Sequence, residues 1–113
     1  MQGLKPGQRL RILIGEAAEH DGKPLYEAIV LKARDMQLAG ATVMRAAMGY
    51  GHSSQLHTAK ILRLSDNLPL VVEIVDSEEK IARFLPLLEG MMSGGLITLE
   101  GIQLVEHGTT QAS

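Results

Sequence analysis

Two histidines in one short polar stretch are the first residues of this sequence whose types and spacing could carry chemistry. His52 and His57 stand five positions apart within MRAAMGYGHSSQLH, the segment 44–57. Imidazole is a common metal ligand, and a loop can bring together a pair at this spacing. No cysteine or aspartate lies nearby to complete a coordination sphere. Three interpretations stay open: solvated loop histidines, contacts to a small ligand, and a divalent-metal site.

Two glycines precede these histidines in the same stretch. Gly49 and Gly51 flank Tyr50, and glycines so placed allow positive φ and let a ligand approach the backbone closely. Their N–H groups could form an anion-binding nest. Neither GxGxxG nor GxxxxGK[ST] is present, so a tight turn that leaves a strand explains the spacing equally well.

A basic residue and a second pair of glycines are further candidates for binding an anion. Arg45 lies inside a predicted strand, on a solvated face or on a subunit interface where its guanidinium could hold a phosphate bidentately. Gly94 and Gly95 precede the last predicted strand, either as a flexible turn or as phosphate-binding backbone. Glu16 ends the first strand, and loops from different strands can meet at one edge of a sheet.

Several classes of function receive no support from the sequence. There is no Ser/His/acid arrangement and no cysteine, so we predict a protein that is not an enzyme. The net charge of −2 is scattered, whereas a nucleic-acid-binding protein should show a basic face. No apolar run approaches the roughly 20 residues that span a bilayer, so we expect no direct membrane insertion. The absence of cysteine fits a cytoplasmic protein.

The hydrophobic periodicity predicts four strands. The first, Arg9–Gly15, alternates apolar and basic residues, as a half-buried strand does. The second spans Ala41–Met48, and the third ends at Val75 after starting near Lys60 and passing a turn signal. The last, Leu96–Val105, loses its alternation at Gly101, where a bulge is expected.

Two stretches with helical spacing separate these strands. One runs from Pro24 through Leu38, with Gly40 expected as the left-handed residue at its C-terminus. The other follows Asp76, which with Glu79 has the spacing of a capping box. Pro86 lies inside the second helix, and we expect a kink or an early end there.

The resulting order is β-α-β-β-α-β, which predicts an α+β ferredoxin-like fold: a four-stranded antiparallel sheet with two helices on one face. At 113 residues the chain fits one domain, 1–113, with flexible ends at 1–8 and 107–113. The strand Leu70–Val75 carries apolar side chains on both faces, so the face without helices should be buried against another copy of the chain. We therefore expect a homo-oligomer.

The sequence also resembles a known family. The motifs that carry the resemblance are Ile14-Gly15-Glu16, Asp21-Gly22-Lys23-Pro24-Leu25-Tyr26, Gly40-Ala41-Thr42-Val43, Gly49-Tyr50-Gly51-His52 with His57, Leu68-Pro69, and Val72-Glu73-Ile74-Val75-Asp76. They are similar to those of the small PII-like proteins catalogued as domain of unknown function 190. The resemblance extends from about Leu10 to Val105.

The resemblance implies a ferredoxin-like homotrimer similar to PII signalling proteins, with no fixed cofactor. Its ligand would be an adenine nucleotide (AMP, ADP or ATP) in the clefts between subunits. The segment 49–59 would be the effector arm toward a partner, for which a membrane transport or channel protein is the candidate. The segment 90–95 would help to hold the nucleotide phosphates.

Three features depart from true PII proteins and weigh against sensing of ATP and 2-oxoglutarate. The effector loop is shorter, no lysine follows the glycine-rich segment before the last strand, and no obvious basic residue follows that strand. The sequence therefore predicts a regulatory protein that binds a small anionic ligand through Arg45, Gly49, Gly51, His52, His57, Gly94 and Gly95. The alternatives are a divalent-metal-binding trimer that uses His52 and His57, and a structural adaptor without a ligand.

Overall fold

The computed structural model describes residues 3–45, 48–50, 56–58 and 69–105. Ten elements follow one another in this part of the chain: β1 (Leu4–Gly15), β2 (Glu19–His20), β3 (Lys23–Pro24), α1 (Leu25–Asp35), β4 (Gly40–Arg45), β5 (Met48–Tyr50), β6 (Leu56–Thr58), β7 (Pro69–Asp76), α3 (Glu78–Met91) and β8 (Leu96–Val105). The four long strands form one sheet, whereas β2–β3 and β5–β6 are separate two-stranded hairpins.

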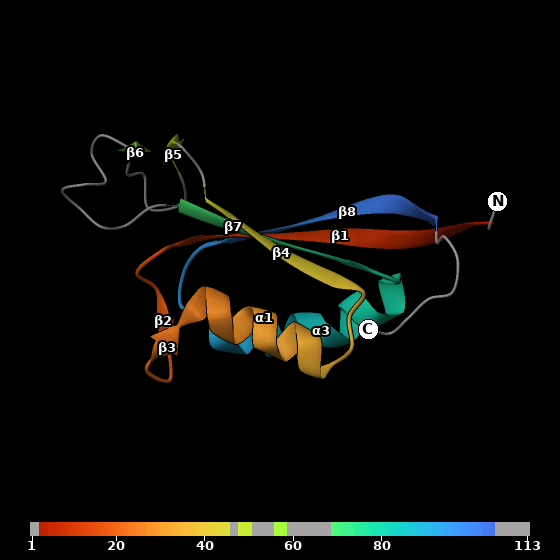
Figure 1. Cartoon of the computed structure of the whole chain (residues 1–113), viewed down its shortest axis with the longest axis horizontal. Coiled ribbons are helices and arrows are strands. Elements are labelled where there is room, and N and C mark those ends of the chain that lie inside the picture. The colour runs from red at the N-terminus through yellow and green to blue at the C-terminus, as the bar shows by residue number, and fades with distance from the viewer. Residues whose placement is uncertain (1–2, 46–47, 51–55, 59–68, 106–113) are drawn as a thin grey trace.

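The main sheet has the order β4-β7-β1-β8, and every neighbouring pair is antiparallel. Both helices lie on one face of it (Figure 1). This arrangement confirms the predicted ferredoxin-like βαββαβ fold. Period-2 alternation directs every second residue of β1 and β7 toward the helices, and these residues meet the buried stripes of α1 and α3. The core consists of Leu10, Ile12, Ile14, Leu25, Ile29, Ala33, Leu70, Val72, Ile74, Ile81, Phe84 and Leu88.

Helix α1 ends earlier than the glycine position predicted. The left-handed residue is Gln37 (φ 59°), and Gly40 instead begins β4. Leu38 N–H donates to Ala33 O at 3.0 Å and Gln37 N–H to Arg34 O at 2.9 Å, which is the Schellman pattern. Leu38 also packs against the core. The helix therefore ends at a left-handed glutamine instead of a glycine, and the residue after it, Leu38, is partly buried against the core.

The start of α3 also differs from the prediction by one residue. The N-cap is Ser77, whose Oγ accepts a hydrogen bond from Lys80 N–H at 3.2 Å. Asp76 is the last residue of β7, and its carboxylate accepts from two backbone N–H groups instead: Ala39 at 2.7 Å and Ser77 at 2.6 Å. The helix then continues past Pro86 to Met91, so the early end expected at this proline is wrong.

The N-terminal half of β1 was not recognised in the sequence. Residues 4–8, expected as part of a flexible end, pair with β8 in a register that runs unbroken from Leu4–Val105 to Leu13–Leu96. The bulge expected at Gly101 is therefore absent. Gly7 allows close packing in this pairing, because a Cβ there would lie 2.6 Å from Leu104 Cδ1 and 2.9 Å from the backbone oxygen of Asp76. The predicted flexible end at 107–113 lies outside the described residues.

The polar connection after β1 is an ordered hairpin. Asp21 (φ 51°) and Gly22 (φ 77°) occupy the two central positions between β2 and β3. Positive φ at both positions is the signature of a type I′ turn, for which Asp-Gly is a favoured pair. The hairpin leads directly into α1, next to the first turn of that helix (Figure 1).

The face of the sheet without helices combines ion pairs with apolar residues. Arg9 Nη2 lies 2.6 Å from Glu100 Oε1, and Arg11 Nε lies 2.8 Å from Glu73 Oε2. By register this open face also carries Leu13, Met44, Val71, Val75 and Leu96. Met44 and Leu96 are 43% and 45% exposed. The single chain thus leaves large apolar side chains beside paired charges on this face.

Arg9 and Glu100 change each other's titration. The hydrogen bond from Arg9, and then its charge, lower the pKa of Glu100, while the hydrogen bond to Glu100 raises the pKa of Arg9. A carboxyl whose pKa is lowered by folding stabilises the folded state above its unfolded pKa. That contribution is lost as the pH falls through the lowered, folded-state value.

Replacing Glu100 by glutamine should therefore lower the thermal unfolding midpoint at pH 7 by a small amount. The difference from the unmodified chain should shrink at pH 3, which lies below the ordinary carboxyl pKa of 4.5, because the unfolded chain then binds a proton at this carboxyl. Added salt should reduce the difference at pH 7, because exposed ion pairs are screened. Midpoints measured by circular dichroism at both pH values check this, and an equal difference at both would contradict it.

Candidate functional site

The candidate residues gather at one end of the sheet, where β1 and β4 finish and β7 and β8 begin. In register, Arg45 lies opposite Leu70, Gly15 opposite Pro69, and Leu13 opposite Leu96. We call this the site end of the sheet. Neighbouring strands lie about 4.8 Å apart, so the outer strands β4 and β8 are separated by roughly 14 Å. Arg45 therefore lies on one side of the site end, and Gly94 and Gly95 lead into the strand on the other side.

Arg45 lies on the helix-covered face of the sheet. A residue of the expected subunit interface would lie on the open face. The partner of Arg45 in register is Leu70, which is buried beneath the helices, so Arg45 belongs to the helix-covered face. Met44 is the β4 residue that faces the open side near this end. At the strand terminus the guanidinium extends past the core, and the Arg45 side chain is 53% exposed. The side chain therefore remains accessible to a ligand.

Glu16 holds this arginine in an ion pair. Its Oε2 lies 2.7 Å from Arg45 Nη1, and the Glu16 side chain is 29% exposed. The two residues come from β4 and from the turn after β1, strands that are separated in the sheet by β7. The pair therefore crosses over the beginning of β7. The sequence marked both residues but not their contact, which depends on the strand order.

Gly95 packs tightly against the end of β1. It has φ 103°, and a Cβ at this position would lie 2.7 Å from Leu13 O and 3.0 Å from Ile14 Cγ2. Gly94, in contrast, has nothing within 4 Å of an added Cβ. A side chain at position 95 would therefore clash with β1. The turn that contains Gly95 is packed against the sheet and is not a free linker.

The segment predicted as a loop contains a short hairpin. Gly49 in β5 pairs with His57 in β6, so their backbones lie side by side. The hairpin extends past the site end, beyond β4 and β7 (Figure 1). Gly51 and His52 lie outside the described residues. The roles predicted for these residues therefore stay predictions.

The metal alternative finds no further support in the described ranges. Between residues 3 and 105, excluding the gaps at 46–47, 51–55 and 59–68, no group of three or more His, Cys, Asp or Glu side chains could hold a metal ion. The predicted pair includes His52, so the alternative itself is not tested. Among the helices that the structure describes, none has both the length and the apolar character needed to cross a membrane.

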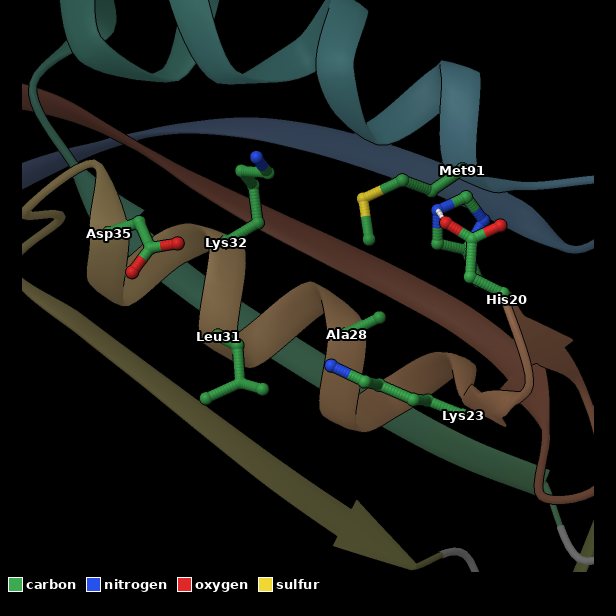
Figure 2. A pocket seen from close by; sticks show the side chains of 8 residues that line it. His20, Lys23, Ala28, Leu31, Lys32, Asp35 and Met91 are labelled. Carbon is green, nitrogen blue, oxygen red and sulfur yellow. Dashed lines mark ion pairs between the residues drawn. The ribbon is translucent and has the colours of Figure 1, made fainter.

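A shallow hollow of about 260 Å³ lies on the outer side of α1, between the β2–β3 hairpin and the end of α3 (Figure 2). Sequence reasoning did not find it, because its lining comes from three separate elements. His20 Nε2 lies 3.4 Å from Asp21 Oδ2 at one side of it. Two lysines and two aspartates line the hollow, so its charges balance: Lys23, Lys32, Asp21 and Asp35. The two lysines and two aspartates of its lining thus leave no excess of positive charge to attract an anion.

Solved structures share this fold. CPII from Thiomonas intermedia K12, a nitrogen regulatory PII-like protein solved bound to ADP, AMP and bicarbonate, matches with a TM-score of 0.66 and 18% identity, over 92% of each chain. A putative PII-like signalling protein from Thermus thermophilus also matches with a TM-score of 0.66 and 18% identity, over 93% of this chain and 94% of that one. At such identities the likeness shows a PII-like fold.

Relatives by sequence are closer. A UPF0166 protein of Aquifex aeolicus is 44% identical over 96 residues, covering 85% of this chain and 90% of that protein. A UPF0166 protein of Methanocaldococcus jannaschii is 37% identical over 91 residues, covering 80% and 83%. The family model described as "Uncharacterized ACR, COG1993", domain of unknown function 190, matches residues 7–104. The chain therefore belongs to the family of domain of unknown function 190, as its motifs predicted.

Proposed function

We propose that this protein is a PII-like regulator that binds an adenine nucleotide in clefts between the subunits of a homotrimer. The observation that carries the proposal is the site end of the sheet, where an accessible arginine and a glycine turn ordered against β1 lie at one end of the molecule. The fold is shared with CPII, which was solved with ADP and AMP bound. The proposal assigns the protein no catalytic step.

The geometry of one chain favours a ligand site made by two chains. Arg45 and the turn at Gly94 and Gly95 lie on opposite outer strands, roughly 14 Å apart. A phosphate group alone is too small to span that backbone distance, although the Arg45 side chain covers part of it by contacting Glu16 across β7. A neighbouring copy placed against the site end would bring its own arginine or glycine turn within reach. The apolar residues of the open face, with Met44 and Leu96 exposed, supply a surface for such association.

Each candidate residue has a chemical role in this proposal. Backbone N–H groups at Gly94 and Gly95 bind phosphate, and Arg45 adds a charge-assisted hydrogen bond. Gly49, Gly51, His52 and His57 contact the ligand or the partner. The segment 49–59 acts as the effector arm, and ligand binding changes its order. The candidate partner remains a membrane transport or channel protein.

Calorimetry with AMP, ADP and ATP tests the proposal directly. Removing the guanidinium in Arg45→Ala should weaken nucleotide binding about 10- to 100-fold, because hydrogen bonds to charged groups contribute roughly 1.5–3 kcal/mol. Arg83→Ala is the matched control, since Arg83 is exposed on α3 and pairs only loosely with Glu79 at 3.7 Å. Sedimentation should show a trimer for all three proteins. A folded trimer that gives no heat with any of the nucleotides would discard the proposal.

A further inference from the structure

The ion pair at the site end has a consequence for which ligands can bind. Any anion that uses Arg45 meets a guanidinium that already contacts Glu16 at 2.7 Å. We propose that Glu16 is a charge-selecting residue, which competes with the ligand for Arg45 and disfavours ligands in proportion to their negative charge. This inference rests on the proposed function, because it concerns the same site.

The competition follows from the geometry of the contact. The Glu16 carboxylate approaches Nη1, while the Arg45 side chain is 53% exposed, so other N–H donors of the guanidinium are open to an incoming group. An incoming phosphate can bind these donors or displace the carboxylate. In either case the phosphate lies within a few ångströms of a carboxylate, where like charges repel. Part of the attraction of Arg45 is thus already offset before the ligand arrives.

The position of Glu16 makes this more than an incidental surface pair. The side chain reaches over the start of β7 to a strand that is not its neighbour, and it is only 29% exposed. Partial burial reduces the screening of its charge by solvent. Glu16 also lies two residues after Ile14 in the sequence, and Gly95 packs against the Ile14 side chain. Glu16 is therefore linked through the chain to the strand end on which Gly95 packs and through its carboxylate to Arg45.

Repulsion of this kind depends on the charge of the ligand. In the unmodified chain, the Glu16 carboxylate should weaken the binding of ADP and ATP more than the binding of AMP. It should not weaken the binding of uncharged adenosine. Replacing Glu16 by glutamine keeps the shape of the side chain and removes its charge. Glu16→Gln should therefore tighten binding in the order ATP, then ADP, then AMP, with a gain of about 5-fold or more for ATP and none for adenosine.

Calorimetric titrations of the full chain and of Glu16→Gln with adenosine, AMP, ADP and ATP provide the test. Glu19→Gln is the matched control, because it removes the same charge from an exposed residue of the β2–β3 hairpin. In an Arg45→Ala background, Glu16→Gln should have a much smaller effect if Glu16 acts through the arginine. Equal unfolding midpoints for the variants would show that the fold is unchanged.

The outcomes distinguish the inference about Glu16 from the proposed nucleotide binding. A gain that rises with ligand charge, and is lost with Arg45→Ala, supports the inference. Binding by Glu16→Gln alone, with none by the unmodified chain, supports it too, since Glu16 would then mask the arginine. Unchanged or uniformly changed affinities, adenosine included, would overturn the inference while nucleotide binding itself stands. No nucleotide binding by either protein would overturn the proposed function together with the inference.

Discussion

Replacing Gly95 by alanine is expected to destabilise the folded chain by about 3 kcal/mol. The residue has φ 103°, where a side chain is strained, and the new Cβ would lie 2.7 Å from Leu13 O. That neighbour is a backbone atom of β1, an interior strand paired on both sides, and cannot move aside easily. The turn must therefore leave β1, which would carry the proposed phosphate-binding N–H groups out of position.

The neighbouring glycine supplies the control for this prediction. Gly94→Ala introduces the same methyl group where nothing lies within 4 Å, so its effect on stability should be within about 0.5 kcal/mol. Urea unfolding of both variants measures the stabilities, and calorimetry with ADP measures the binding. Comparable losses in the two variants would show that the packing of Gly95 on β1 does not position this turn.

Removal of the Asp76 carboxylate is the second change with a large expected effect. Asp76 is 8% exposed, and Asp76→Ala leaves the N–H groups of Ala39 and Ser77 without their acceptor. Unsatisfied, partly buried donors each cost about 1–3 kcal/mol, so the two together are expected to cost roughly 2–6 kcal/mol. Because Ala39 directly precedes β4, the change should also loosen the strand that ends in Arg45.

Ser77→Ala distinguishes the contribution of the Asp76 carboxylate from that of ordinary helix capping. Ser77 Oγ accepts one hydrogen bond, from Lys80 N–H, and loss of an N-cap hydroxyl costs about 1 kcal/mol. Chemical unfolding of both variants should therefore rank Asp76→Ala as the more damaging. If Ser77→Ala were equally destabilising, the link from β7 to the turn before β4 would contribute little.

Local sequence patterns predicted the elements of this fold well, because alternation and helical spacing are local signals. The last strand, Leu96–Val105, agrees with the structure at both ends. Errors arose where a tertiary contact overrode a local preference. Leu38 packs on the core beyond a left-handed Gln37, and the Asp76 carboxylate binds Ala39 N–H rather than capping the helix.

The candidate site was predictable in its residue types but not in its contacts. Arg45 was marked as a phosphate ligand and Glu16 as the end of a strand, yet neither spacing nor composition indicates that they pair. Their contact depends on β7 lying between β1 and β4 and on the face that each side chain takes. The hollow beside α1 was missed for the same reason, since three elements that are distant in sequence form it.

The most direct test of the central claim is to locate the bound nucleotide by NMR. Titrating the ¹⁵N-labelled protein with ADP should shift the backbone amides of Glu16, Arg45, Gly94 and Gly95, while amides on the outer side of α1 stay unchanged. Shifts confined to His20, Lys32 and their neighbours in that hollow, with the site end unaffected, would contradict the claim that the nucleotide binds where β1, β4 and β8 meet their connecting turns.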